Sequence, residues 1–278
     1  MKNVGKLSCK EGGSIKALLL AAGLGTRLKG LTDDWPKCLM PVGGIPLLEH
    51  WIGIMASCGI GATLVNVHHH QEKVIDFLGR SQFAGNVEYV YEDKLLGTAG
   101  TLRENKSFFE EKTFLLAHAD NWCQCDFDSF VDYHRRLRPK DCPITMMTFE
   151  TKAPEACGIV EKDVNGIVVR MHEKVANPPG NCANGAVYIL EPEILEFLEV
   201  NPHISDFSTE VIPAFFGRIA TWHNDDILRD IGTLESLQIA QTDPLPARDL
   251  DVIDGWTRWF ESHPIHQQIK VPQRNSYS

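Results

Sequence analysis

Short apolar runs alternate with amphipathic segments along the first half of the chain. Residues 15–22, 62–67 and 113–119 have the length and apolar character of single buried strands, and residues 87–91 predict a further strand of alternating character. Residues 46–58, 72–78 and 126–138 instead have helical spacing, the last with Asp126 as a candidate N-cap. Strands that alternate with helices in this way predict an α/β fold with a doubly wound, mainly parallel sheet.

The second half of the chain is richer in strand signals. Strands are predicted at residues 144–150, 158–161, 167–171, 182–190, 219–222 and 227–229, and Asn165-Gly166 is a strong hairpin-turn signal. Helices are predicted at residues 192–200, 207–215 and 233–241, the last capped by Thr233. We expect these strands to extend a Rossmann-like sheet and to add a β-rich portion beside a ligand pocket.

Length and composition indicate a globular protein with a substantial core: 278 residues, of which 43% are hydrophobic. We expect a flexible polar arm at residues 1–14, a single domain at residues 15–242 and a C-terminal extension at residues 243–278. Residues 249–260 of the extension predict an amphipathic helix with Trp256 and Trp259. These tryptophans either cover the core of the same chain or form a subunit contact, so a homo-oligomer stays open.

Charge and hydropathy exclude several classes of protein. The net charge of −10 is opposite in sign to that of a typical nucleic-acid binder. No apolar run approaches the ~20 residues of a membrane span, and residues 1–14 lack the hydrophobic core of a secretion signal. Among the eight cysteines, Cys123 and Cys125 are near neighbours that we expect as reduced loop thiols. We therefore predict a cytoplasmic protein with no nucleic-acid or membrane partner.

A glycine-rich loop follows the first predicted strand, with Gly23 and Gly25 and the cations Arg27 and Lys37. Glycines leave backbone N–H groups open to a ligand, and nearby cations favour phosphates. The loop is not a P-loop, because it lacks Gly-Lys-Ser/Thr, and Leu28 replaces the third glycine of a dinucleotide fingerprint. The loop therefore predicts a phosphate site of another kind; the alternative is a plain strand-to-helix turn.

The other predicted strands also end in polar or flexible residues. The second ends near Asn66 and His68, and the third leads to a loop at residues 97–100, here called the Gly97 loop. Asp120 directly follows the fourth. Ligands of open parallel sheets bind beyond the carboxyl ends of the strands. Asp120 and the more distant Asp230 are candidate Mg²⁺ ligands, since one or two carboxylates commonly hold Mg²⁺ at phosphates. Each could instead be a helix cap or a loop hydrogen-bonding group.

Three consecutive histidines, His68, His69 and His70, suggest a metal cluster at first sight. Consecutive residues at a strand end point in different directions, so one ion cannot easily use all three. We interpret them as surface loop histidines.

Several segments closely resemble the motifs of sugar-1-phosphate nucleotidylyltransferases, and they occur in the family's order. These segments are residues 20–28 (LAAGLGTRL), 36–42 (PKCLMPV), 96–100 (LGTAG), 119–121 (ADN), 173–174 (EK), 184–185 (NG) and 230–233 (DIGT). The resemblance covers about residues 15–242. Two positions depart from the family pattern, since Gly30 and Val175 stand where the family often has proline. The long acyltransferase domain of some relatives has no counterpart here, so we expect a single activity.

The resemblance implies that a sugar 1-phosphate attacks the α-phosphorus of a nucleoside triphosphate and pyrophosphate leaves. It implies catalytic roles for Arg27, Lys37 and Asp120, and Mg²⁺ binding by Asp120 and Asp230. The implied nucleotide-binding residues are Leu20, Ala21, Ala22, Gly23, Gly25, Thr26, Gly97, Thr98 and Ala99. The implied sugar-phosphate-binding residues are Glu173, Lys174, Asn184 and Gly185. Positioning and charge neutralisation supply most of the rate in such reactions, so no nucleophilic side chain is required.

The motifs, the Gly97 loop among them, favour GTP and a mannose- or heptose-type sugar 1-phosphate over other substrates. The alternatives are uridylyl or thymidylyl transfer to another sugar 1-phosphate, a non-catalytic nucleotide-sugar sensor, and a sugar kinase. A sensor should have lost Arg27, Lys37, Asp120 or Asp230, and all four are present.

Overall fold

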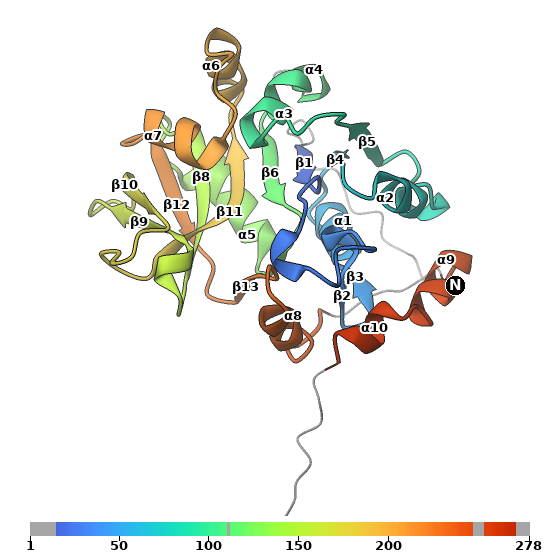
Figure 1. Cartoon of the computed structure of the whole chain (residues 1–278). Helices are drawn as coiled ribbons and strands as arrows, with labels where there is room; N and C mark the ends of the chain where they lie inside the picture. The colour runs from blue at the N-terminus through green and yellow to red at the C-terminus, as the bar shows by residue number, and fades with distance from the viewer. Residues whose placement is uncertain (1–14, 110–111, 247–252, 271–278) are drawn as a thin grey trace, which may run out of the picture.

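The computed structural model describes residues 15–109, 112–246 and 253–270, and its centre is a nine-stranded mixed sheet (Figure 1). One half of the sheet is parallel, with the order β5-β4-β1-β6. Its strands are β1 (Lys16–Leu20), β4 (Ala62–Val67), β5 (Val87–Tyr91) and β6 (Phe114–His118). The prediction of a Rossmann-like α/β fold is thus confirmed.

Strand β1 lies at the middle of the parallel half and is buried on both faces. Ala17 and Leu19 pack with the helices α1 (Leu47–Ser57) and α2 (Gln71–Leu78). Leu18 and Leu20 point to the opposite cluster, which contains α3 (Thr98–Glu104), α4 (Lys106–Phe109) and α6 (Glu193–Val200). Side chains alternate across a strand, so a continuous apolar run serves two cores at once.

The other half of the sheet is mostly antiparallel. Strand β11 (Cys182–Leu190) pairs with β6 and β8 (Ile144–Glu150), and β8 pairs with β12 (Ile219–His223). A hairpin of β9 (Gly158–Lys162) and β10 (Val168–Glu173) adds to β11. Gly166 has a φ of +79° in the predicted turn between them. The second half therefore extends the same sheet, as its strand signals predicted, except that the strand predicted at residues 227–229 lies in a separate two-stranded sheet.

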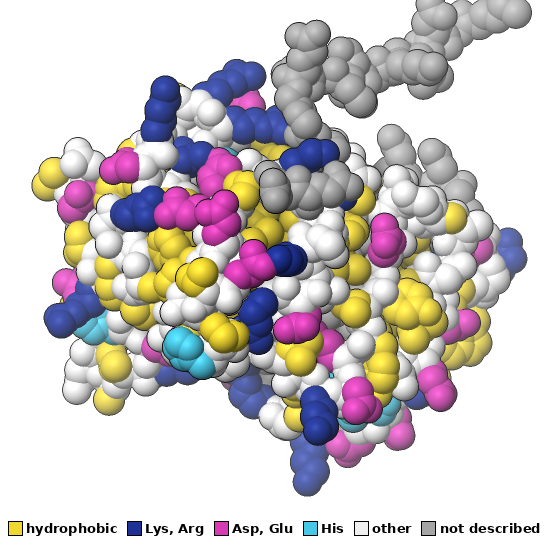
Figure 2. Space-filling model, turned by 90° about the horizontal axis from the view of Figure 1, so that it is seen from above, with side chains coloured by type: hydrophobic (Ala, Val, Ile, Leu, Met, Phe, Trp, Pro, Cys, Tyr) yellow, Lys and Arg dark blue, Asp and Glu magenta, His cyan; other side chains and the backbone are white. Residues whose placement is uncertain are grey.

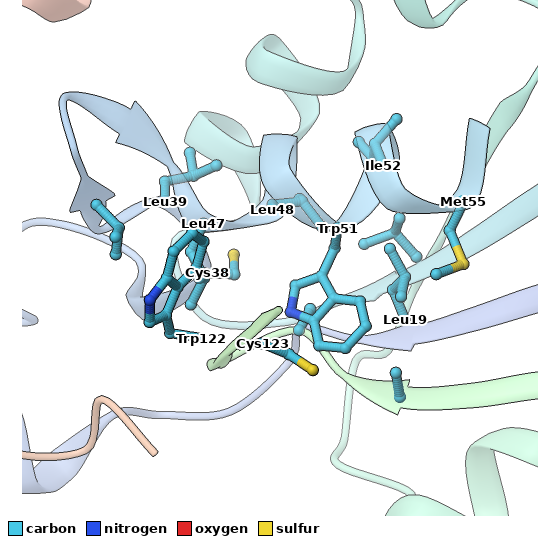
Figure 3. Close-up of a cluster of buried hydrophobic side chains, with 14 of the residues drawn as sticks. Leu19, Cys38, Leu39, Leu47, Leu48, Trp51, Ile52, Met55, Trp122 and Cys123 are labelled. Carbon is cyan, nitrogen blue, oxygen red and sulfur yellow. The ribbon is translucent and has the colours of Figure 1, made fainter. Parts of the chain in front are cut away.

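Two short ribbons lie outside the main sheet: β2 (Pro41–Val42) with β3 (Ile45–Pro46), and β7 (Asn121–Gln124) with β13 (Ile227–Asp230). The prediction that Cys123 is a loop thiol was wrong. Cys123 lies in β7 and is buried beside α1, where Figure 3 shows it with Trp122 and Trp51. The strand forms because β13, more than a hundred residues later, supplies its hydrogen-bonding partner.

The remaining helices are α5 (Phe127–Asp132), α7 (Ile212–Ala214), α8 (Leu234–Ala240), α9 (Gly255–Glu261) and α10 (Ile265–Gln268). The predicted caps are confirmed, since Asp126 accepts from Ser129 N–H and Thr233 forms a capping box with Ser236. The arm at residues 1–14 and residues 249–252 of the predicted C-terminal helix lie outside the described residues. No helix in the described ranges has the length and apolar character to cross a membrane.

Candidate active site

The glycine-rich loop leaves β1 at the carboxyl edge of the sheet and is held by Thr32. Gly25 has a φ of +64°, and a Cβ there would lie 2.8 Å from Thr32 Cγ2. Thr32 Oγ1 donates a hydrogen bond to the Gly25 carbonyl at 3.0 Å. A left-handed φ and this close approach together require glycine. The loop is thus built around Gly25, and it leads directly into a 3₁₀ turn at Thr26–Leu28.

Gly30, which departs from the family pattern, has a φ of +96° with open space around it. Proline is confined to a φ near −65°, so it cannot adopt this backbone conformation. Proline at residue 30 is therefore incompatible with the path that this loop takes.

Lys37 lies at the centre of a charged cluster beside this loop. Its Nζ is 2.7 Å from Asp120 Oδ2 and 3.0 Å from Asp230 Oδ1. Arg27 Nη2 is 2.6 Å from the other oxygen of Asp230. The side chain of Lys37 is only 5% exposed, whereas both carboxylates reach solvent. The structure thus brings together all four residues whose sequence motifs suggested charge chemistry.

Strand pairing explains how two aspartates 110 positions apart meet. Asp120 directly precedes β7, and Asp230 is the last residue of β13. The two strands are antiparallel, with Asp230 opposite Asn121. This register places the two carboxylates side by side, and Gly232 beyond them lets the Arg27 guanidinium lie against the backbone.

The charges of this cluster are mutually stabilised. Burial alone would lower the pKa of Lys37, but Asp120 and Asp230 outweigh it and the pKa is raised. Desolvation alone would raise the pKa of Asp230, but Lys37 and Arg27 reverse this effect and the pKa is lowered. The lysine is therefore a cation and Asp230 an anion at neutral pH.

The donor set of Asp120 and Asp230 fits Mg²⁺ only together with further ligands. In residues 15–109, 112–246 and 253–270, no three His, Cys, Asp or Glu side chains form a metal-binding group. Two converging carboxylates are nevertheless the protein contribution expected when phosphate oxygens and waters complete the coordination of Mg²⁺.

A buried polar network behind the loop was missed as a functional feature. Asn66 Oδ1 accepts a hydrogen bond from Ala21 N–H at 2.7 Å, and Asn66 Nδ2 donates to Glu92 Oε1 at 2.9 Å. Glu92 also accepts from the Thr101 hydroxyl and from Leu96 N–H. The network ties the end of β1 to the start of the Gly97 loop. The only sequence signal was the position of Asn66 near a strand end.

The Gly97 loop packs against the chain before Phe207. Ala99 N–H donates to the Ser205 carbonyl at 2.9 Å, and a Cβ on Gly97 would lie 2.4 Å from that oxygen. Thr98 Oγ1 accepts from Phe207 N–H at 2.6 Å. Glycine is therefore required at residue 97 by close packing as well as by its φ of +76°. Leu20, Ala22 and Ala99 are buried, and the Ala99 N–H is already bonded to Ser205.

Of the four predicted sugar-side residues, Glu173 ends β10, Lys174 directly follows it, and Asn184 and Gly185 lie on β11. A Cβ on Gly158 would lie 2.6 Å from Glu173 Oε2, so the carboxylate packs against this glycine. Lys174 Nζ is 3.3 Å from Glu173 Oε1. Asn184 Nδ2 donates to the Tyr188 hydroxyl at 2.7 Å, where the register of β11 shifts. A Cβ on Gly185 would lie 2.7 Å from Leu228 of β13. The sugar-side strand thus packs directly on the strand that carries Asp230.

The histidines after β4 lie in a half-buried loop, as interpreted from the sequence. His70 Nε2 is 3.0 Å and His69 Nε2 is 3.4 Å from the Thr32 carbonyl oxygen, to which ring N–H groups donate. His68 Nδ1 lies 2.8 Å from the Glu92 carbonyl. Their contacts support the glycine-rich loop from behind.

Residues 16–245 match the model of the family described as nucleotidyl transferase. The chain belongs to this family. The match contains every site residue discussed above. The charged cluster, the Gly97 loop and strands β10 and β11 therefore all lie within the residues that match the family model.

Named nucleotidyl transferase relatives are mannose-1-phosphate guanylyltransferases. The chain is 28% identical over 194 residues to the mannose-1-phosphate guanyltransferase of Saccharomyces cerevisiae, covering 68% of this chain and 53% of the relative. It is 27% identical over 226 residues to the mannose-1-phosphate guanylyltransferase of Mycobacterium tuberculosis, covering 80% of this chain and 62% of the relative. The chain spans about half the length of the curated relatives it matches.

Solved structures share the fold. A Bacillus anthracis protein assigned as a glucose-1-phosphate thymidylyltransferase superposes with a TM-score of 0.73 at 22% identity, covering 84% of this chain and 98% of that one. HddC from Yersinia pseudotuberculosis, complexed with GMP-PN, superposes with a TM-score of 0.69 at 24% identity, covering 82% and 98%. At these identities the similarity shows the fold alone.

Proposed function

We propose that this chain is a sugar-1-phosphate nucleotidylyltransferase, in which residues 15–242 form the nucleotidyltransferase domain. The observation that carries the proposal is the convergence of Arg27, Lys37, Asp120 and Asp230 beside the glycine-rich loop. A plain strand-to-helix turn does not need two cations and two carboxylates at one point. Nucleotidyl transfer needs such a cluster, because charge moves among phosphates with little covalent help from protein.

In the proposed reaction, a phosphate oxygen of the sugar 1-phosphate attacks the α-phosphorus of the triphosphate. The bond from the α-phosphorus to the bridging oxygen breaks, and pyrophosphate leaves with its electron pair. Arg27 neutralises the departing pyrophosphate, and Lys37 contacts the α-phosphate or the sugar phosphate. Mg²⁺, held by Asp120 and Asp230, supplies further charge neutralisation when bound with the triphosphate. Because Lys37 contacts both carboxylates, its ammonium must exchange partners to bind a phosphate.

Substrate binding is proposed for two flanks of this cluster. Gly23, Gly25 and Thr26 with the Gly97 loop (Gly97, Thr98, Ala99) and the backbone of residues 20–22 bind the nucleotide. The sugar phosphate contacts Glu173, Lys174, Asn184 and Gly185. Of the backbone donors at residues 20–22, Ala21 N–H is already bound to Asn66, so this donor is not available for reading the base.

The proposed base is guanine and the proposed sugar is mannose- or heptose-like. The support is that similar proteins are named mannose-1-phosphate guanylyltransferases and that a structural neighbour was solved with GMP-PN. Thymidylyl transfer is the second candidate, because another structural neighbour is assigned to it. A role in nucleotide-sugar and polysaccharide biosynthesis in the cytoplasm follows from either candidate as part of the proposal.

The test is pyrophosphate release, measured for each of the four ribonucleoside triphosphates and dTTP with a panel of sugar 1-phosphates and Mg²⁺. We expect GTP with mannose 1-phosphate or a heptose 1-phosphate to give the highest rate. ADP release with ATP would instead indicate a kinase. Nucleotide-sugar binding without turnover would indicate a sensor, and no sugar-dependent pyrophosphate from any triphosphate would refute the proposal.

Asp120→Asn tests the role of the carboxylate. We expect Mg²⁺-dependent turnover to fall to background while the melting temperature stays near that of wild type, because the change removes a charge at a partly exposed position. Asp225→Asn is the control, since the Asp225 side chain is 93% exposed and away from the cluster. Wild-type turnover in Asp120→Asn would contradict the assigned role.

A further inference from the structure

Of the C-terminal helices α9 and α10, which lie outside the proposed catalytic domain, α9 contacts Trp35 beside the turn that carries Lys37. Lys37, Cys38 and Leu39 form a 3₁₀ turn closed by hydrogen bonds from Leu39 N–H to the Pro36 carbonyl and from Met40 N–H to the Lys37 carbonyl. Cys38 and Leu39 point into the core beside Leu47, as Figure 3 shows. The outer side of the turn is closed by a different residue, Trp35.

Trp35 is buried and links the turn to the C-terminal helices. Its Nε1 donates to the Leu39 carbonyl at 2.9 Å. Its ring stacks on Phe260 of α9 with 5.8 Å between centroids, and lies 4.3 Å from the ring of His263. The Lys37 turn is therefore sandwiched between the core and residues more than 220 positions later in the chain.

The C-terminal helices are anchored independently of the turn. Arg80 donates to Asp254 Oδ2, the N-cap of α9, and to Thr257 Oγ1, each at 2.7 Å. The same guanidinium donates to Glu49 of α1 at 2.7 Å, and Trp256 packs on Phe77 of α2. Moving α9 would leave the almost fully buried Arg80 without two of its partners, which is costly.

These contacts assign one of the two tryptophans of the C-terminal extension to the core of the same chain. Trp256 and Phe260 cover the core of the same chain, while Trp259 is about half exposed. From the anchored position of α9 and the contact through Trp35, we propose that α9 and α10 brace the Lys37 turn. Trp35 and Phe260 are then positioning residues for Lys37 in the proposed nucleotidyl transfer, on which this inference rests.

The test compares Phe260→Leu with Phe215→Leu in the full chain. Both variants replace a buried phenyl group, but Phe215 lies in the other core cluster, away from the Lys37 turn. For Phe260→Leu we expect faster hydrogen–deuterium exchange at the amides of Leu39 and Met40. We also expect kcat to fall about tenfold with little change in KM, because a displaced ammonium no longer meets the charge of the transition state. Phe215→Leu should change neither quantity.

Trp35→Phe keeps a ring against Phe260 but loses the bond to Leu39, so we expect the same two changes at smaller size. Wild-type exchange at Leu39 and Met40 in a folded Phe260→Leu protein would overturn the inference, and so would an equal effect from Phe215→Leu. Exchange needs no substrate, so it decides the brace even if no nucleotide is turned over. Absence of turnover in the wild type would refute the proposed function separately.

Discussion

Two clusters in this protein have the same plan, one cation between two carboxylates, but different surroundings. Lys37 lies between Asp120 and Asp230, whose side chains are 30% and 46% exposed. Arg80 lies between Glu49 and Asp254, which are 17% and 23% exposed, and it also packs on the rings of Phe77, Phe83 and Trp256. The first cluster is open to solvent on its acidic side, and the second is closed.

The difference shows how one charge pattern serves either exchange or anchoring. A lysine ammonium is a compact charge on a flexible stem, so it can leave a carboxylate for a phosphate. The Arg80 guanidinium instead donates to side chains of α1 and α9 in a fixed fork, and at 4% exposure it is closed to a ligand. We therefore propose that the Lys37 cluster takes part in the reaction and that the Arg80 cluster fixes the position of the C-terminal helices.

Replacing each cation by methionine is the strongest way to break this comparison. For Lys37→Met we expect kcat/KM to fall about 10³-fold, or about 4 kcal/mol of barrier, because one preorganised charge is lost. Its free energy of unfolding should change by only about 1 kcal/mol, because the two carboxylates can hydrate. Steady-state turnover measures kcat/KM, and urea denaturation measures the free energy of unfolding. Lys29→Met, at an exposed position in the same segment, is the control.

For Arg80→Met the expected order is reversed, with stability as the largest loss. We expect a loss of about 3–5 kcal/mol in the free energy of unfolding, because Glu49 and Asp254 remain mostly buried without a counter-charge. Arg136→Met is the matched control, since Arg136 forms an exposed pair with Asp132, and it should cost less than about 0.5 kcal/mol. Similar losses for both arginines would refute the distinction between closed and open clusters.

Acid and salt should produce the smallest effect and sharpen the comparison. The pKa values of Asp230 and Asp254 are both lowered, although desolvation by burial opposes the shift in each case. For Asp230 the desolvation is outweighed by Lys37 and Arg27. For Asp254 it is outweighed by Arg80 and by the hydrogen bonds from Thr257. Each carboxylate therefore stabilises the fold above its unfolded pKa, about 3.9, and this contribution disappears as the pH falls through the lower folded pKa. We expect the stability differences between wild type and Asp230→Asn or Asp254→Asn to shrink on acidification from pH 7.

Salt should separate the two aspartates, because about 1 M NaCl shortens the Debye length to about 3 Å and screens exposed pairs most. At pH 7 we expect added NaCl to reduce the stability difference for Asp230→Asn and to leave that for Asp254→Asn nearly unchanged. Chemical denaturation at two salt concentrations measures this. An equal salt response would show that both clusters are equally accessible to ions.

On the face seen in Figure 2, basic and acidic side chains are interspersed and no single-sign region dominates. Positive charge is instead concentrated locally, at Arg27 and Lys37, beside two carboxylates. Such a local arrangement suits a small phosphorylated ligand better than a long polyanion.

Local features of the fold were predictable from the sequence because each depends on neighbouring residues. The parallel strands follow from apolar runs, and the caps at Asp126 and Thr233 from side chains that reach backbone N–H groups three residues on. The turn at Gly166 follows from its accessible left-handed φ. The four residues of the charged cluster were also identified from the sequence, because each belongs to a short motif of neighbouring residues.

Tertiary structure alone decided how those residues meet. The β7–β13 pairing that places Asp230 beside Asp120, the Ser205 contact that requires Gly97, and the packing of α9 against Trp35 all join residues about a hundred or more positions apart. No local pattern encodes such pairs, because each partner is only one of many that would satisfy the same hydrogen bond or bury the same ring. The sequence by itself determined the main-sheet strands, most of the helices and the candidate chemistry, but not the short strand β7. The choice among long-range partners, made by packing the whole chain at once, determined the site.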